Sequence, residues 1–568
     1  MQLVNSLHFR NLRGDIFGGL TAAVVALPLA LAFGVSSGAG PIAGLYGAII
    51  VGFFAALFGG TPSQISGPTG PMTVVVATVF AGVAASNSEN GMAIAFTIIM
   101  LGGVLQILFG LLRLGNYITL MPYTVISGFM SGVGVIIILI QVGPFLGHEA
   151  TADVVSSLRQ FPEFFANPNP ADTALGILTL AIVFLCPRSI TRWVPSPLIA
   201  LIVGTIGAVV IGYYVPDSGL RLIGNIPSGL PKLQMPTIDP TQLRSIFGYS
   251  LMLAVLGSID SLLTSLVADN ITRTQHNSDR ELIGQGIGNL LSGLCGGLPG
   301  AGATMRTVIN VKSGGRTPIS GMIHALVLLI VVLKAGALTA NIPEAVLAGI
   351  LIKVGIDIID WSFLKRAHQI SLKATSLMYL VLLLTVFVDL IVAVTLGVFF
   401  SNLLAMKSLS DIQSNKVKAI TNPDEDMGLN IAERHILKRA KGKILLFNLT
   451  GPMSFGAAKT ISQRMGIVRE YEVLILDLSD VPLLGVTASL AIENMVKDAC
   501  ESRHQVFLVG AKGKVRERLQ RMKLLELLPA ENCFPERLSA LEKALNWIES
   551  YSQQVIETQK ASQDSSFN

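Results

Sequence analysis

The chain has 568 residues, of which 51% are hydrophobic and only 14% are charged, and its mean hydropathy of +0.62 is outside the range of soluble domains. The net charge of +5 is modest, so we expect Lys and Arg to mark cytoplasmic loops and not to bind nucleic acid. The four cysteines have no metal or redox spacing, which argues against a zinc site or a disulfide framework.

Apolar residues are concentrated in one part of the chain. From residue 16 to residue 406 they form runs of roughly 17–25 residues, the length of a membrane-spanning helix. Residues 1–15 are basic and amphipathic without a small-residue cleavage site, which favours a cytoplasmic lead-in helix over a signal peptide. About fourteen spans fit the pattern, and Lys and Arg fall in alternate loops. This predicts an all-α, multi-pass domain in the plasma (inner) membrane with both termini in the cytoplasm.

Two short segments interrupt the apolar spans. One reads SGPTGPM from Ser66 to Met72, and the other reads GGLPGAGATMR from Gly296 to Arg306. Gly, Pro and Thr before a β-branched run predict an unwound lead that feeds a half-length helix, whose first N–H groups lack partners. Each segment lies roughly fifty residues into its half of the membrane domain, a pattern typical of inverted-repeat transporters with a midplane site.

Half-helix N-termini that face each other predict the sign of the substrate. Each contributes about half a positive charge and free amide donors, so the substrate should be an anion. Arg306 lies in the first turn of the second half-helix and would add a full positive charge. A structural pairing of Arg306 with a carbonyl or a carboxylate is the alternative.

A carboxylate lies within the apolar span from Tyr249 to Val267. Asp260 and Thr264 are four residues apart, so their oxygens point to the same helical face. Hard oxygens suit a hard cation, and a sodium ion completed by Thr304 and by carbonyls near Gly302 is one hypothesis. A proton on Asp260 and an ion pair between Asp260 and Arg306 are the two alternatives.

After residue 406 the composition becomes that of a soluble domain. Apolar strand runs occur at 443–449, 473–478 and 505–510, with helical patterns between them. We therefore predict an α/β domain over residues 433–551. Residues 407–432 are predicted as a linker, and the polar residues 552–568 as a disordered tail.

Four motifs carry a family resemblance. They are ALPLALAFG at 26–34, GLYG at 44–47, SGPTG at 66–70 and SGGRTP at 313–318. The motifs are similar to those of the SulP anion-permease family, and the resemblance covers nearly the whole chain. It implies a seven-plus-seven inverted repeat, divided into a core and a gate domain, with a cytosolic STAS domain at the C-terminal end.

Within the family the closest likeness is to sodium-dependent bicarbonate importers. That resemblance implies a bicarbonate site formed by Thr69, Gly70, Ala303, Thr304 and Arg306. It implies a sodium site formed by Asp260, Thr264, Gly302 and Thr304. Sodium is then a co-transported ion, and no other cofactor is expected. In such proteins the STAS domain supports dimer contacts, which implies a homodimer in the lipid bilayer.

Coupling to sodium also agrees with the energetics of import. Moving one monovalent anion against an inside-negative potential costs about 2.3 kcal/mol per 100 mV, and a co-moving sodium cancels that cost. We therefore predict a secondary transporter that imports bicarbonate with sodium by alternating access. The alternatives are a proton-coupled sulfate or dicarboxylate permease, an anion exchanger, and a STAS-based membrane receptor. An enzyme is not expected, because the sequence shows no nucleophile with its base and no nucleotide loop.

Overall fold

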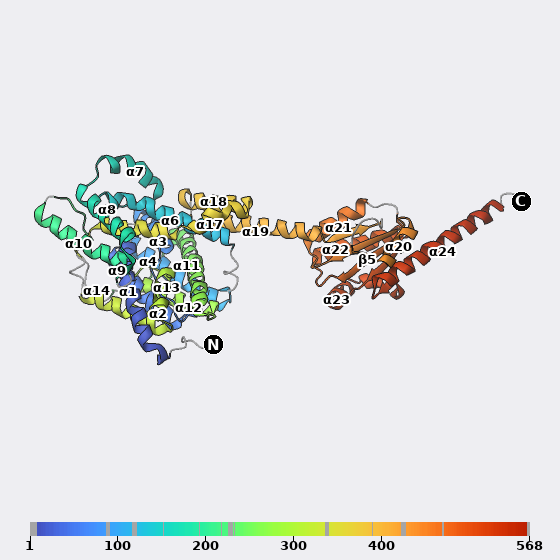
Figure 1. Ribbon diagram of the computed structural model, residues 1–568, viewed down its shortest axis with the longest axis horizontal. Coiled ribbons are helices and arrows are strands. Elements are labelled where there is room, and N and C mark those ends of the chain that lie inside the picture. Colours follow the sequence, from blue (N-terminus) through green and yellow to red (C-terminus); the bar gives the residue numbers. More distant parts are fainter. Residues whose placement is uncertain are drawn as a thin grey trace. The chain divides into compact units, whose positions relative to one another are not determined.

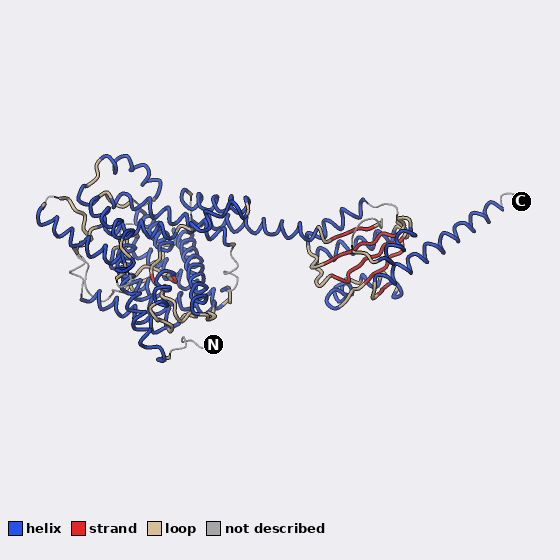
Figure 2. Tube along the Cα trace, viewed as in Figure 1, coloured by secondary structure: helices blue, strands red, loops and turns tan. Residues whose placement is uncertain are grey.

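The computed structural model describes residues 8–564 except 87–90, 116–121, 152, 192–193, 217, 225–230, 232, 335–339, 389, 422–427 and 468–470. The chain divides into two compact units, Met1–Ser401 and Asn402–Asn568. The first unit is helical, whereas the second contains a β-sheet flanked by helices (Figures 1 and 2).

The first unit repeats one order of elements. Its first half contains η1 Phe9–Asn11, α1 Leu12–Ser36, α2 Pro41–Phe58, β1 Ser66–Gly67, α3 Gly70–Ser86, α4 Gly91–Leu111, α6 Tyr123–Phe145, α7 Val154–Ala166, α8 Pro170–Leu185, α9 Arg188–Thr191 and α10 Ser196–Tyr214. Its second half contains η2 Pro240–Gln242, α11 Leu243–Thr272, α12 Ser278–Leu294, β2 Ala301–Gly302, α13 Thr304–Lys312, α14 Pro318–Lys334, α16 Glu344–Ile358, α17 Trp361–Ile370, α18 Leu372–Phe387 and the start of α19 Leu390–Ser414. The order of two helices, a two-residue strand and a further helix therefore occurs in both halves.

The helix lengths support a polytopic membrane domain. Seven helices in the described ranges are long and apolar enough to cross a membrane, or eight if α7 and α8, bent by 110°, form one span. Shorter apolar helices occur within α3, α14 and α18, and half-length helices of this kind are expected in an inverted-repeat transporter. The count of about fourteen spans stays a prediction.

The helices of the first unit pack in two groups. The first four membrane helices, α1 to α4, pack with α11, α12, α13 and α14, whereas α6, α8 and α10 pack with α16 and α18. These groups correspond to the predicted core and gate. The core is close-packed: a Cβ added at Gly103 of α4 would lie 2.4 Å from the main-chain nitrogen of Leu290 in α12. Glycine at this position therefore allows the two helices to approach closely.

The predicted lead-in overlaps the first helix. Helix α1 begins at Leu12, and Asp15, predicted to lie in the lead-in, is fully buried. Its carboxylate accepts hydrogen bonds from the Thr317 hydroxyl (2.7 Å) and from the main-chain N–H groups of Arg316 (2.8 Å) and Thr317 (3.0 Å). These contacts hold the start of α1 against the loop before α14, so α1 begins earlier than hydropathy indicates.

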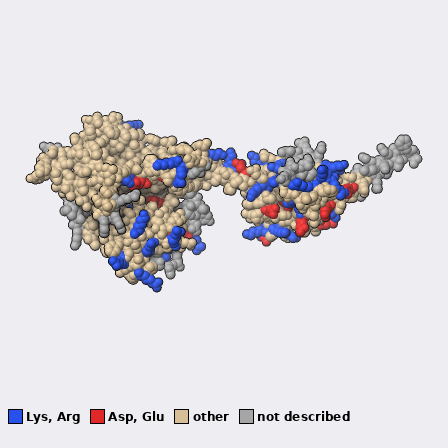
Figure 3. Space-filling model, in the orientation of Figure 1, with Lys and Arg blue, Asp and Glu red and all other residues tan. Residues whose placement is uncertain are grey.

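Charge is distributed differently over the two units. In Figure 3 few charged side chains lie over α8 and α10, whereas the second unit carries both Lys/Arg and Asp/Glu. On α10 the apolar side chains of Ile202, Ile206 and Val209 are half exposed. An extended apolar surface of this kind suits contact with lipid.

The second unit is an α/β domain. Its elements are β3 Val417–Ile420, α20 Ile431–Ala440, β4 Ile444–Thr450, α21 Phe455–Ile467, β5 Val473–Asp480, α22 Val486–Glu501, β6 Gln505–Val509, α23 Gly513–Arg521, η3 Leu524–Glu526, η4 Ala530–Asn532, β7 Cys533–Phe534 and α24 Arg537–Asp564. The sheet order is β3-β4-β5-β6-β7, with β3 antiparallel to β4 and the other pairs parallel.

Both faces of the sheet are covered by helices. On β4, Leu445, Phe447 and Leu449 pack in one core with α21, α22 and α23, whereas Ile444 and Leu446 pack in a second core with α20 and α24. Alternate residues of a strand point to opposite faces, so the continuous apolar run is explained by burial on both faces. The three predicted strand runs correspond to β4, β5 and β6.

Two boundaries of this domain differ from the predicted ones. The range 407–432, predicted as a linker, contains the end of α19 and β3, which pairs with β4 from Val417↔Leu449 to Ile420↔Leu446. A strand of four residues with a lysine in it gives little sequence signal. The range 552–568, predicted as a disordered tail, is helical to Asp564. Its Ala, Gln, Glu and Lys residues are good helix formers, which explains the longer helix.

The sheet core gives a stability prediction. Phe447 is fully buried, so Phe447→Ala should lower the free energy of unfolding of the 402–568 unit by about 3–5 kcal/mol. Urea unfolding of that unit followed by circular dichroism measures the change. Leu490→Ala on α22, where the side chain is half exposed, is the control and should change it by less than about 0.5 kcal/mol. Equal effects of the two changes would contradict the assignment of the core.

Candidate functional site

The two broken segments meet in the first unit, as predicted for a common site. Strand β1 pairs with β2 in antiparallel register, with Ser66 opposite Gly302 and Gly67 opposite Ala301. Helices α3 and α13 begin a few residues after these strands. The N-termini of two half-helices from different halves of the chain therefore lie side by side.

The starts of both helices leave amide donors available. The N-cap residue of α13 is Ala303, which has no side-chain oxygen to accept from the first-turn N–H groups. In α3 the first intrahelical hydrogen bond runs from the Thr73 N–H to the Thr69 carbonyl (2.9 Å). The Gly70 N–H lies before this bond and therefore has no partner within the helix. Free N–H groups and two helix dipoles make the region electropositive, which suits an anion.

Thr69 and Asp260 face each other across the start of α3. The Thr69 hydroxyl and Oδ2 of Asp260 are buried without a hydrogen-bond partner of normal geometry among the described residues. The two side chains are nevertheless close enough to interact. Two polar groups that leave bonding capacity unused in a buried place suit a bound ligand between or beside them.

Three of the four oxygens predicted for sodium are in contact, and the fourth, that of Asp260, lies one helical turn away. The Thr264 hydroxyl on α11 lies 2.9 Å from the Gly302 carbonyl and 2.7 Å from the Thr304 hydroxyl, and Asp260 lies one turn before it. Ser261, which the sequence analysis did not single out, accepts the Gly302 N–H at 3.1 Å. A carboxylate, two hydroxyls and a main-chain carbonyl are hard donors that suit sodium or a proton.

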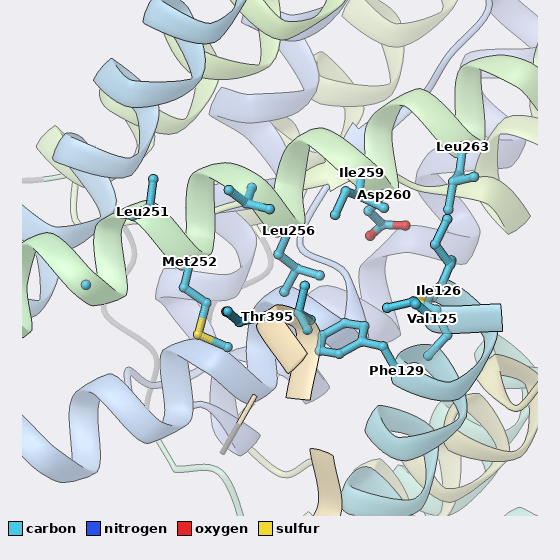
Figure 4. Close-up of a pocket in the computed structure, with 14 residues that line it drawn as sticks. Val125, Ile126, Phe129, Leu251, Met252, Leu256, Ile259, Asp260, Leu263 and Thr395 are labelled. Atoms are coloured by element: carbon cyan, nitrogen blue, oxygen red, sulfur yellow. The ribbon is translucent and has the colours of Figure 1, made fainter. Parts of the chain in front are cut away.

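Asp260 lies at the edge of a cavity of about 200 Å³ (Figure 4). Helices α6, α11 and α19 line this cavity, and Phe129, Leu256 and Ile259 contribute apolar walls next to the carboxylate. Asp260 itself is only 8% exposed. Because α11 belongs to the core group and α6 to the gate group, the carboxylate lies where the two groups meet.

Arg306 bonds a main-chain carbonyl, which is one of the two structural partners that the sequence left open, and not the Asp260 carboxylate. Its side chain is buried, and its Nη2 donates to the Pro68 carbonyl at 2.5 Å. Asp260 and Arg306, both within the described ranges, form no ion pair, and Oδ2 of Asp260 accepts no hydrogen bond from Arg306. Arg306 therefore reaches from the second half of the chain to the unwound lead of the first. It places its positive charge next to Thr69.

All eight predicted site residues lie in one region. Thr69 and Gly70 come from the first broken segment, and the others come from α11 and from the second broken segment: Asp260, Thr264, Gly302, Ala303, Thr304 and Arg306. Sequence reasoning missed Gln64, whose Oε1 lies 3.1 Å from the Ser265 hydroxyl on α11. The spacing of Ser258, Ser261 and Ser265 along an apolar helix is the signal that could have extended the prediction.

Family models match both units of the chain. Residues 12–382 match the model of the sulfate permease family, and residues 435–540 match that of the STAS domain. The second match starts after β3 and ends within α24. The first match includes every residue of the candidate site.

Two curated proteins are similar to this chain over nearly their whole length. The bicarbonate transporter BicA of Picosynechococcus is 53% identical over 96% of this chain and 97% of its own length. BicA of Synechocystis is 52% identical over 96% of both chains. The solved transmembrane domain of a cyanobacterial BicA is 55% identical, with a TM-score of 0.65, and covers 69% of this chain and 100% of that domain.

Proposed function

Because the chain belongs to the sulfate permease family, we propose that it imports bicarbonate together with sodium by alternating access of the core and gate groups. The observation that carries this proposal is the pairing of β1 with β2 beside Asp260 and Thr264. It places two electropositive helix starts next to a group of hard oxygens. An anion and a cation can therefore bind close together.

Bicarbonate is the anion that the relatives favour. Two proteins more than 50% identical over almost the full length are named bicarbonate transporters. The chemistry of the site is compatible with this choice, because N–H groups and the hydroxyls of Thr69 and Thr304 can hold a small monoanion that both donates and accepts hydrogen bonds. Arg306 supplies long-range positive charge from its position at the Pro68 carbonyl.

Sodium is the cation that the oxygens favour. The four groups of Asp260, Thr264, Gly302 and Thr304 include one carboxylate, so a bound sodium ion would neutralise the charge of Asp260. One sodium moving with one bicarbonate carries no net charge across the membrane, so the potential would not oppose import. No resident cofactor is needed for this function, and sodium is cargo.

The proposal extends to location and assembly. The apolar surface of the helical unit suits a lipid bilayer, and Lys and Arg in alternate loops suit a plasma-membrane protein with both termini in the cytoplasm. The STAS domain follows the last membrane helix and is proposed to support a homodimer.

Uptake in proteoliposomes tests the function. The purified chain should accumulate labelled bicarbonate only with an inward sodium gradient, and unlabelled sulfate or chloride in about tenfold excess should compete weakly. Uptake that follows a pH gradient in sodium-free buffer would indicate a proton-coupled permease. Flux only against a counter-anion would indicate an exchanger, and the absence of flux under all conditions would favour a receptor. Each of these three results would overturn the proposal.

A further inference from the structure

One helix of the core carries a series of buried polar side chains. Glu281, Gln285, Asn289 and Ser292 lie along α12 at spacings of four, four and three residues, so they share one helical face. Each is at most 2% exposed. We call these four residues the α12 ladder. A polar side chain inside a membrane domain lowers stability unless it is hydrogen-bonded, so the partners of these residues indicate what they do.

The first two residues of the ladder hold the lead of the first half-helix. The Glu281 carboxylate accepts from the Gly60 main-chain N–H (2.8 Å) and from the Gln64 side-chain amide (2.7 Å). The Gln285 side-chain nitrogen lies 2.6 Å from the Ser66 hydroxyl in β1 and 2.8 Å from Glu281. Both ends of the unwound segment before Thr69 are therefore attached to α12.

The other two residues hold the lead of the second half-helix. The Asn289 side chain donates to the Gly300 carbonyl (3.0 Å) and accepts from the Gly300 N–H (2.7 Å), so it binds both polar groups of one residue. The Ser292 hydroxyl donates to the Leu298 carbonyl (2.7 Å). These bonds lie immediately before Gly302, whose carbonyl belongs to the proposed sodium site.

The arrangement gives the ladder a role beyond stability. Unwound backbone in a membrane protein must find partners outside its own segment. Here α12 supplies partners to both leads, so it helps to fix the distance between the two helix starts, together with the pairing of β1 with β2. We infer that the ladder residues are positioning residues for transport. Glu281 and Gln285 position the lead of α3, which belongs to the proposed anion site, and Asn289 and Ser292 position the lead that contains Gly302 of the proposed sodium site.

The test rests on the proposed function and compares substitutions in the full-length protein. Gln285→Met removes both hydrogen bonds of the amide at similar volume, and it should raise the bicarbonate half-saturation concentration about tenfold. Asn289→Ala and the milder Ser292→Ala should raise the sodium half-saturation concentration, by about tenfold and about fivefold. If Asn289→Ala fails to fold, Ser292→Ala still tests whether the ladder positions the proposed sodium site.

Ser250→Ala is the matched control for Ser292→Ala. Ser250 is an equally buried serine of the core, and its hydroxyl bonds the Ile98 carbonyl of a neighbouring helix at 3.0 Å and the Ile246 carbonyl of its own helix at 2.7 Å. Among the described residues it bonds neither lead. A merely structural role predicts lower melting temperatures and maximal rates with half-saturation concentrations unchanged, as for the control. That result in the ladder variants would overturn the inference.

A second measurement does not depend on the identity of the substrates. Hydrogen exchange of the main-chain N–H groups between Leu298 and Gly302 should be at least about tenfold faster in Asn289→Ala or Ser292→Ala than in Ser250→Ala. If the wild-type protein showed no sodium-dependent bicarbonate uptake, the proposed function would be wrong. The exchange rates would still show whether the ladder residues hold the two leads in place. Faster exchange supports its role in holding the leads, and unchanged exchange refutes it.

Discussion

Thr69→Leu should reduce bicarbonate uptake to a few per cent of the wild-type rate while the protein still inserts and folds. Thr69 is 8% exposed at the start of α3, and its hydroxyl has no partner of normal geometry among the described residues. Leucine would fill the space between the half-helix starts and remove the hydroxyl. Overpacking of this kind costs about 1–3 kcal/mol of stability, which a membrane domain of this size should tolerate.

Finer substitutions at Thr69 separate the hydroxyl from the volume. Thr69→Val removes the hydroxyl at nearly constant shape and should raise the bicarbonate half-saturation concentration about tenfold, whereas Thr69→Ser should change it little. Thr375→Val is the control, because Thr375 on α18 is similarly buried and its hydroxyl bonds the carbonyl of Ser371, the N-cap of its own helix. Initial uptake rates against bicarbonate concentration distinguish these variants. Wild-type kinetics for Thr69→Leu would place the anion site elsewhere.

The main features of the site could be predicted because their signals are local. Gly, Pro and Thr in the segments at 66–72 and 296–306 specify unwound leads and helix starts, and helix starts attract anions. Asp260 and Thr264 share a face through simple helical spacing. The meeting of the two helix starts followed from the position of the two segments in their repeats, whereas the short strands β1 and β2 that join them were not predicted.

Other features depend on contacts between distant residues. Arg306 could not be assigned from sequence, because the choice between a carboxylate and the Pro68 carbonyl depends on how two halves of the chain pack. The buried Asp15 lies in a basic, amphipathic stretch, and its partner Thr317 is about 300 residues away. Strand β3 has only four residues and is defined by its pairing with β4. In each case the deciding partner is remote, so the local pattern carries no signal for it.

Asp260→Asn should raise the sodium half-saturation concentration at least about tenfold, a loss of about 1.4 kcal/mol in sodium binding, with a smaller effect of Thr264→Ala. The reason is that Asp260 lies one turn before Thr264 on the same helix and is the one carboxylate of the proposed sodium site, and asparagine keeps its volume without its charge. Asp269→Asn is the control on the same helix, because the Asp269 carboxylate bonds His276 and not the site.

Three partners of the buried Asp260 carboxylate predict different results, since an uncompensated charge at this depth costs about 2.5–3.5 kcal/mol. If sodium is the partner, uptake by Asp260→Asn at fixed pH should require much more sodium. If a proton is the partner, wild-type uptake should follow pH and ignore sodium. If Arg306 were the partner, adding Arg306→Gln should restore the folding of Asp260→Asn. Because Arg306 bonds the Pro68 carbonyl, we expect no such rescue, and an unchanged sodium half-saturation concentration in Asp260→Asn would exclude the sodium site.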